Sequence, residues 1–226
     1  MQKQDAQSST TVWNVLKGAV SLGVLFLTVQ PGVTSEVQDG ETAVLSQVLS
    51  ATSIDLIDEH SGAERVVLMT GTNPDASTAD LAITTGVPHR GTEKIVLIVR
   101  DIAFAGPMSG QIPYLERAPN GSLLIQSMQT AVGRSPWEET LTLAKRDGAI
   151  VVAGFTRNSW DRISATGSSC DWNLLSGNWE LSYQVPVEGS DEVRSVRKSG
   201  RKEERIQIAD WPERSASLTA FCSPEE

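Results

Sequence analysis

Cysteine and histidine are scarce in this chain, and their scarcity excludes several kinds of site. Among 226 residues there are two cysteines and two histidines, His60 and His89. Two of each are too few soft ligands for a zinc finger or a metal cluster. The nucleophile pattern Gly-x-Ser-x-Gly also does not occur, so a Ser–His–carboxylate triad is not expected. We therefore predict no metal site and no cofactor.

The chain also lacks an excess of positive charge. Its 19 Lys and Arg residues stand against 28 Asp and Glu residues, which gives a formal net charge of −9. A general nucleic-acid binder needs a basic surface to displace counterions, so nucleic acid is not expected as a partner. Hydrophobic residues make up 39% of the chain, which is enough for an ordinary core and argues against broad disorder.

Long hydrophobic runs are missing as well, with one short exception near the N-terminus. Residues 18–29 are strongly apolar, but this stretch of about 12 residues is shorter than the ~20 that span a bilayer. It follows Lys17 and precedes a Pro-Gly pair and three small residues. This arrangement predicts a secretory signal peptide over residues 1–35, followed by one β-rich domain over residues 36–226. The alternative is an uncleaved anchor, because the polar segment before Lys17 is long.

Export fixes the expected state of the two cysteines, Cys170 and Cys222. Cleavage would leave the mature chain periplasmic or secreted, with no membrane span. Two cysteines in an exported chain most often pair, so we predict a disulfide. Closing a loop of about 50 residues would contribute roughly 4 kcal/mol in the chain-entropy model. Two free thiols in a reducing compartment are the alternative.

The mature sequence reads mainly as β-strands. Runs rich in β-branched residues alternate with Gly, Asn, Asp and Pro, and they occupy residues 65–70, 80–84, 94–100, 179–185, 192–197 and 205–209. The all-apolar run 95–99 predicts a central strand buried on both faces. Helical spacing of apolar residues occurs over 41–50, and the chain after Trp211 is expected to be irregular. The predicted fold is mainly β: an antiparallel meander or two-sheet sandwich with one N-terminal helix and one disulfide.

Two hairpins have clear turn signals. Asn120-Gly121 and Asp147-Gly148 each lie between two candidate strands, and both dipeptides tolerate the positive φ of tight turns. In the second hairpin, regular pairing on a two-residue turn would place Leu141 opposite Gly154. A further turn is expected at Ser199-Gly200.

A longer motif gives a family resemblance. Residues 133–142 read GRSPWEETLT, and they are followed by RDG at 146–148, VVAGFT at 151–156 and CDWNLLSG at 170–177. Over residues 93–182 this resembles uncharacterised exported proteobacterial proteins with a GRSPWEQTLT…RDG…VVAGFTY…CDVNLLTG run, often behind a degenerate FG-GAP-like segment. The resemblance implies export, β-structure and a disulfide. It implies no activity.

The candidate binding residues are tryptophans and arginines that this motif brings close in sequence. Indole and guanidinium groups are favoured at binding hot spots and can stack on sugars or peptides. We predict a binding surface for an envelope protein or a glycan, formed by Arg134, Trp137, Trp160, Arg162 and Trp172. The alternative is that the indoles fill the sheet core or cover the disulfide.

Acidic and basic groups offer three other hypotheses. A calcium-binding loop at Asn73, Asp75, Ser77 and Asp80 is not favoured, because only two of these residues carry a carboxylate, so we expect a solvated turn. The basic run is expected to be the charged edge of a hairpin and not an anion site, and it comprises Arg194, Arg197, Lys198, Arg201 and Lys202.

A non-enzymatic binding or structural accessory module is the favoured function. The alternative is a secreted hydrolase that uses Asp101, Asp161 and Asp171.

Overall fold

The computed structural model describes residues 39–56, 63–73, 75–85, 93–190 and 192–223. The chain divides into two units, Met1–Glu36 and Val37–Glu226, and the description below concerns the second unit. The predicted signal peptide, His60 and His89 lie outside the described residues. Within the described ranges, no helix has the length and apolarity needed to cross a membrane.

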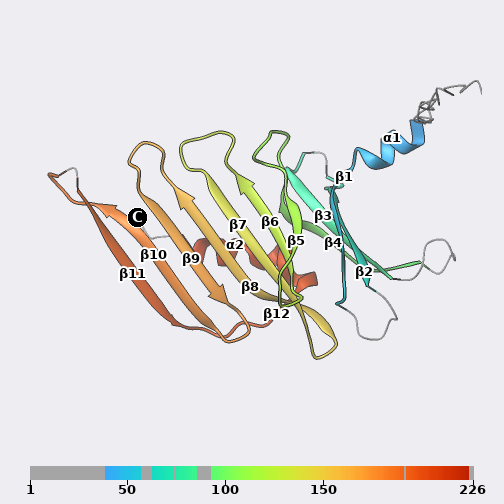
Figure 1. Ribbon diagram of the computed structural model, residues 1–226. Coiled ribbons are helices and arrows are strands. Elements are labelled where there is room, and N and C mark those ends of the chain that lie inside the picture. The colour runs from blue at the N-terminus through green and yellow to red at the C-terminus, as the bar shows by residue number, and fades with distance from the viewer. Residues whose placement is uncertain (1–38, 57–62, 74, 86–92, 191, 224–226) are drawn as a thin grey trace, which may run out of the picture. The chain divides into compact units, whose positions relative to one another are not determined.

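Two antiparallel sheets make up most of this unit (Figure 1). The first has four strands in sequence order, namely β1 (Val48–Ile54), β2 (Glu64–Thr70), β3 (Thr78–Thr85) and β4 (Lys94–Phe104). The second is a meander of β5 (Tyr114–Arg117), β6 (Leu123–Gln129), β7 (Trp137–Arg146), β8 (Ala149–Trp160), β9 (Gly167–Asn173), β10 (Asn178–Pro186) and β11 (Val193–Arg201). A short strand, β12 (Ile206–Gln207), pairs with β8. The prediction of a mainly β fold with antiparallel sheets is confirmed.

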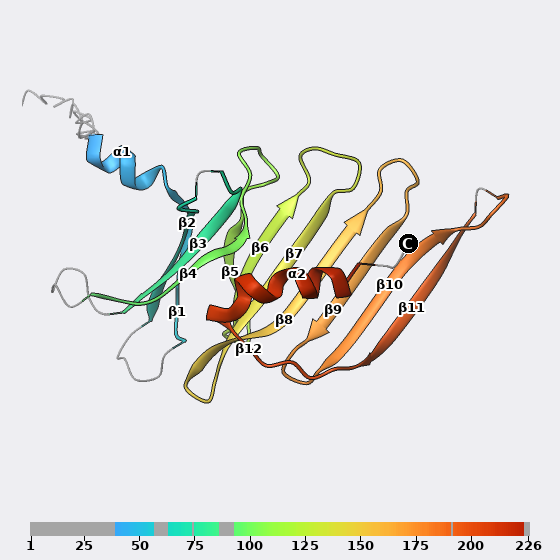
Figure 2. The ribbon, with the colours of Figure 1, turned by 180° about the vertical axis from the view of Figure 1, so that it is seen from behind.

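Both ends of the described chain carry a helix. The N-terminal helix α1 spans Asp39–Leu45, so the predicted helix over 41–50 was too long. Val48 already pairs with Met69 of β2, and this strand pairing overrides the local helical spacing. The C-terminal segment is not irregular as expected. It forms a short 3-10 helix (η2, Ile208–Asp210) and then α2 (Trp211–Phe221), which crosses one face of the second sheet (Figure 2).

The hydrophobic core is shared by both sheets and α2. Leu68, Leu81 and Val99 of the first sheet join one buried cluster with Phe155 of β8 and Leu218 of α2. Burying one such side chain contributes roughly 1.5–3 kcal/mol, so this cluster accounts for much of the stability.

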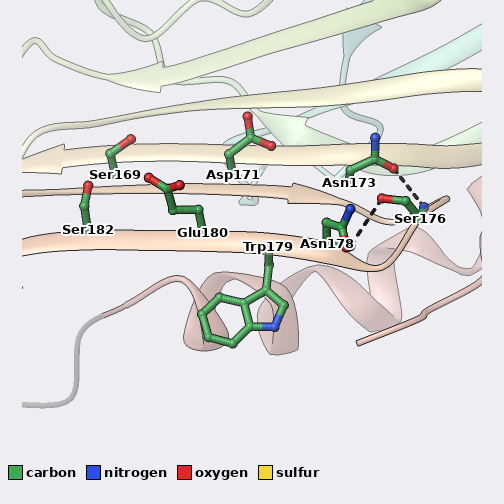
Figure 3. A pocket seen from close by; sticks show the side chains of 8 residues that line it. All are labelled: Ser169, Asp171, Asn173, Ser176, Asn178, Trp179, Glu180 and Ser182. Carbon is green, nitrogen blue, oxygen red and sulfur yellow. Dashed lines mark hydrogen bonds between the residues drawn. The ribbon is translucent and has the colours of Figure 1, made fainter. Parts of the chain in front are cut away.

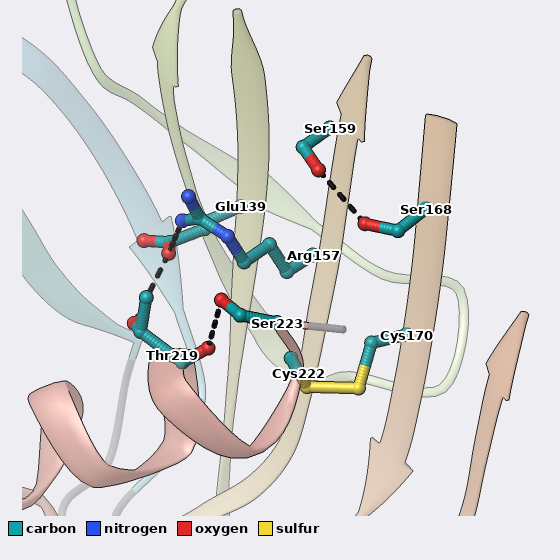
Figure 4. The surroundings of a disulfide bond; sticks show 8 residues. All are labelled: Glu139, Arg157, Ser159, Ser168, Cys170, Thr219, Cys222 and Ser223. Carbon is teal, nitrogen blue, oxygen red and sulfur yellow. Dashed lines mark hydrogen bonds and ion pairs between the residues drawn. A yellow bond between two sulfur atoms is a disulfide. The ribbon is translucent and has the colours of Figure 1, made fainter. Parts of the chain in front are cut away.

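The predicted disulfide is confirmed. It joins Cys170 on β9 to Cys222 at the end of α2, and both residues are buried (Figure 4). The bridge fastens α2 to the core face of the second sheet.

The prediction for residues 95–99 was wrong. Strand β4 is the last strand of its sheet and not a central one, and Ile95, Val96 and Ile98 are 64%, 42% and 41% exposed. An apolar run looks the same in sequence whether a strand has two neighbours or one, and the neighbours are decided by tertiary pairing.

The hairpins are confirmed, with one change of register. Asp147 and Gly148 have φ values of 51° and 78°, as a tight turn requires. Leu141 faces Phe155 and not Gly154, because the register shifts by one residue between Thr142 and Leu143. The extra residue on β8 is Ala153, a β-bulge that reverses the side-chain alternation and turns Phe155 into the core.

The turn expected at Ser199-Gly200 does not exist, because both residues lie within β11. Gly200 faces Trp179 of β10, and a Cβ at this position would lie 2.9 Å from the indole. Glycine is therefore needed here so that the indole can pack across the strand, which explains why a turn signal occurs inside a strand.

Candidate functional site

Strand alternation gives the second sheet two chemically different faces. Leu141, Phe155, Cys170, Trp172 and Leu181 point to the core face, which α2 crosses. The opposite side, here called the outer face, carries the alternate residues of β7 to β10. These are Glu138, Thr140, Thr142, Gly154, Thr156, Asn158, Trp160, Ser169, Asp171, Asn173, Asn178, Glu180, Ser182 and Gln184. All of these are half-buried or exposed, whereas Ala144 and Val151, which point to the same side near the Asp147-Gly148 turn, are buried.

The strand register aligns outer-face residues in rows that run across the sheet. One row consists of Gln126, Thr140, Thr156, Asp171 and Glu180, each directly opposite the next. Neighbouring strands lie about 4.8 Å apart, so these side chains are in contact range of one another. Thr140 Oγ1 donates a hydrogen bond to Gln126 Oε1 at 2.5 Å. The row therefore presents hydroxyl, amide and carboxylate groups side by side.

A shallow depression of about 530 Å³ lies where β9 and β10 meet on the outer face. Figure 3 shows Ser169, Asp171 and Glu180 on one side of the sheet, whereas the Trp179 indole points to the other side, toward the helix. Glu180 forms an ion pair with Arg197 of β11, with Nε and Oε1 3.1 Å apart. The Asp171 carboxylate has no ion-pair partner among the described residues and stays available to a ligand.

Trp172, one of the predicted binding residues, does not lie on a surface. It is 1% exposed, its ring packs on Phe221 with centroids 4.3 Å apart, and its Nε1 donates to Lys202 O at 3.2 Å. Trp172 and Cys170 are two residues apart on β9, so their side chains point to the same side of the sheet, which is the core face. The alternative interpretation, that indoles fill the sheet core, describes Trp172 correctly.

Arg134 and Arg162 lie close together, in the loops after β6 and β8. Arg134 Nε pairs with Asp161 Oδ2 at 2.6 Å. Arg162 donates to the carbonyls of Gly133 and Thr130 at 3.0 and 2.6 Å. Both guanidinium groups therefore tie one loop to the other, and less of their hydrogen-bonding capacity remains for a ligand.

The carboxylate between these loops has a perturbed acidity. The backbone N–H of Ile163 is the main cause that holds the pKa of Asp161 below its ordinary value of 3.8. Desolvation is the next largest effect and opposes it, while the N–H of Ser164 and the Arg134 guanidinium lower the pKa further. Asp161 is thus an ionised loop anchor.

The two remaining tryptophans of the predicted surface, Trp137 and Trp160, lie on opposite faces of the second sheet. Trp137 packs against Phe104, with ring centroids 5.5 Å apart, and the Arg157 guanidinium lies 4.9 Å from the centroid of its ring. Trp160 is 37% exposed and shares its strand parity with Thr156 and Asn158. Of the five residues predicted from sequence, Trp160 alone belongs to the outer face.

The three carboxylates of the hydrolase hypothesis do not meet. Asp101 borders a groove of about 470 Å³ between β4, the core face and α2. Asp161 is held in a loop, and Asp171 lies on the outer face. The groove also contains Glu139, which is engaged by Arg157 and by Thr219 (Figure 4). Asp101 and Asp171 lie on opposite sides of the second sheet and cannot act on one bond.

The candidate calcium loop and the basic run, the two other charged motifs of the sequence, also have structural roles. Asp80 is not solvated, because its buried carboxylate accepts hydrogen bonds from Thr72 N, Asp101 N and Arg100. Within the described ranges, no group of three or more His, Cys, Asp or Glu side chains is placed to hold a metal ion.

The basic run lies mostly on β11, which pairs along β10 and ends the sheet. Several of its bases have local partners: Arg197 pairs with Glu180, Lys202 Nζ lies 2.7 Å from Glu204 Oε1, and Lys198 lies over the Tyr183 ring. This arrangement agrees with the charged strand edge that the sequence predicted.

Comparison with known proteins gives no match: no family model, no curated protein and no solved structure is similar to this chain. The resemblance to exported proteobacterial proteins therefore stays a prediction. The outer face is the candidate site on the strength of its geometry alone.

Proposed function

We propose that this chain is an exported binding module, periplasmic or secreted, without catalytic activity of its own, and that its ligand docks on the outer face of the second sheet. Support for export comes from the buried disulfide between Cys170 and Cys222, since such bonds persist in oxidising compartments. The apolar segment over residues 18–29 supplies the export signal.

One observation carries the choice of surface. The second sheet completes its core on one face only, where α2 and residues of the first sheet join the buried cluster. Apart from Ala144 and Val151, which are buried near the Asp147-Gly148 turn, the side chains of the outer face are half-buried or exposed and are not needed to fill the core. They nevertheless form ordered rows of hydrogen-bonding groups over four neighbouring strands. A one-sided antiparallel sheet can face water, and its polar side can serve recognition without loss of stability.

A paired set of variants tests this surface. Thr156→Arg places a bulky charge at the centre of the outer face, and Ser217→Arg places the same group on the exposed side of α2. The mature, oxidised chain is immobilised and incubated with fractionated cell-envelope components, both protein and polysaccharide. We expect a retained component that Thr156→Arg loses and Ser217→Arg keeps. Equal retention by both variants would reject the outer face as the binding surface.

A further inference from the structure

We propose that the ligand of the outer face is a neutral glycan, whose hydroxyl groups bond to the side-chain rows and one of whose sugar rings stacks on Trp160. This inference rests on the proposed binding function and names its ligand class. It is drawn from three features of the outer face: its hydrogen-bonding groups, its charge and its exposed indole.

The hydrogen-bonding groups are of a kind that suits hydroxyls. Side chains of Ser, Thr, Asn and Gln each offer both a donor and an acceptor, and a sugar hydroxyl also does both. The half-buried and exposed outer-face residues named above include no aliphatic side chain, whereas Ala144 and Val151, which point to the same side near the Asp147-Gly148 turn, are buried. The nearest partly exposed apolar side chains, Leu124 and Met128, lie on β6 at the margin. A docking protein normally buries apolar anchors at the centre of its interface, and this centre offers none.

The charges of the face favour a neutral ligand. Glu180 is already paired with Arg197, and Asp171 and Glu138 are the remaining acids of the outer-face set. An anionic polysaccharide would be repelled by these two carboxylates. A neutral polyol can instead donate two hydroxyl hydrogens to the Asp171 carboxylate, in charge-assisted bonds that are stronger than neutral ones.

The geometry of the face matches an extended chain of sugar rings. Neighbouring side chains within a row lie about 4.8 Å apart, and successive rows lie about 6.7 Å apart along the strands, so hydroxyls along a glycan can meet successive strands. The depression of about 530 Å³ beside Asp171 gives room for part of such a chain. Thr156 and Ser169 lie on the strands that lead from this depression to Trp160.

Trp160 supplies the stacking surface. It lies at the end of β8, 37% exposed, and the residue directly opposite on β9 is Gly167, which has no side chain to cover the indole. A rigid indole presents a large contact area at little entropic cost. The apolar C–H face of a sugar ring packs on such a surface while the ring hydroxyls reach the polar rows.

The test is direct binding of the mature, oxidised chain to an array of neutral oligosaccharides, with oligogalacturonate and oligolysine as charged comparisons. We expect binding to a neutral glycan, followed by calorimetry of that glycan with two variants. Asp171→Asn and Trp160→Ala should each weaken the affinity by about tenfold or more. Glu213→Gln, an exposed change on α2, should leave it unchanged, and added salt should alter Kd by no more than about twofold.

Other results would overturn the inference. Binding only to oligolysine, lost in high salt, would identify a basic peptide as the ligand. Binding only to oligogalacturonate would identify an anionic one. If no glycan binds but a Thr156→Arg-sensitive protein is captured, the glycan is wrong and the binding face stands. If neither ligand is retained, both proposals fail.

Discussion

The indole of Trp211 donates a hydrogen bond to the carbonyl oxygen of Ile102 at 2.9 Å, across 109 residues of sequence. Trp211 begins α2 and Ile102 lies on β4, so this bond joins the C-terminal helix to the first sheet. Both residues are buried, and the Trp211 ring also lies 5.6 Å from the ring of Phe155 in the second sheet. The C-terminal helix is thus an integral part of the core.

Replacing Trp211 with Phe tests this bond. The aromatic ring is kept while the donor is lost, which leaves the buried Ile102 carbonyl without that partner. We expect the free energy of unfolding to fall by about 1–3 kcal/mol, measured by urea denaturation. Trp160→Phe serves as the control, because this exposed residue should change stability by no more than about 0.5 kcal/mol. Equal effects of the two changes would contradict the role of the bond.

Removing the disulfide should lower the free energy of unfolding by more than the loss of the Trp211 hydrogen bond does. The double change Cys170→Ala and Cys222→Ala opens a loop with a sequence separation of 52 residues. We expect the free energy of unfolding to fall by about 2–4 kcal/mol, and reduced wild-type protein should behave as the variant does. Denaturation midpoints with and without reductant check this. An unchanged midpoint in reductant would show that the bridge is not formed in the protein.

Because of the bulge at Ala153, alanine substitutions at two adjacent residues of β8 should lower the free energy of unfolding by different amounts. Phe155 is 1% exposed, so Phe155→Ala should lower stability by about 3–5 kcal/mol through the cavity it leaves. Thr156 points to the outer face, and Thr156→Ala should cost less than about 1 kcal/mol. Chemical denaturation of both variants measures the difference. The opposite ranking would mean that the hairpin pairs without a bulge.

Asp161 should titrate below its ordinary pKa of 3.8 in the folded protein. A folded-state pKa below the unfolded one means that the loop is stabilised above the unfolded pKa, and that this contribution is lost as pH falls through the folded value. Carbonyl NMR titration measures the pKa. Arg134→Ala should raise it only in part, because the Ile163 N–H is the larger cause. A wild-type pKa of 3.8 or above would contradict the anchoring role.

How far the fold follows from the sequence depends on how local each signal is. Asp147-Gly148 specifies its turn within two residues, so the hairpin is predictable. The bulge at Ala153 is decided by whether Phe155 fits the core, and nothing in the local pattern reports that. Helix α2 was not predicted, because only Trp211 and Leu218 of its 11 residues are buried and the sequence shows no clear alternation of apolar and polar residues with helical spacing.

The same limit applies to the site. Sequence identifies tryptophan and arginine as residues suited to binding, but it does not say which face of a sheet they occupy. Trp172 and Asp171 are neighbours in sequence, and one is buried while the other is exposed. The outer face became recognisable once the register aligned Thr140, Thr156 and Asp171 from three strands.

Export underlies every proposal made for this protein, because a disulfide between Cys170 and Cys222 and an envelope ligand both require it. The most direct measurement is the intact mass of the chain isolated from its own cells after thiol alkylation without reduction. The expected result is a chain that begins at Glu36 and carries no alkyl group on either cysteine. A chain that begins at Met1 with both cysteines alkylated would contradict export and the bridge together.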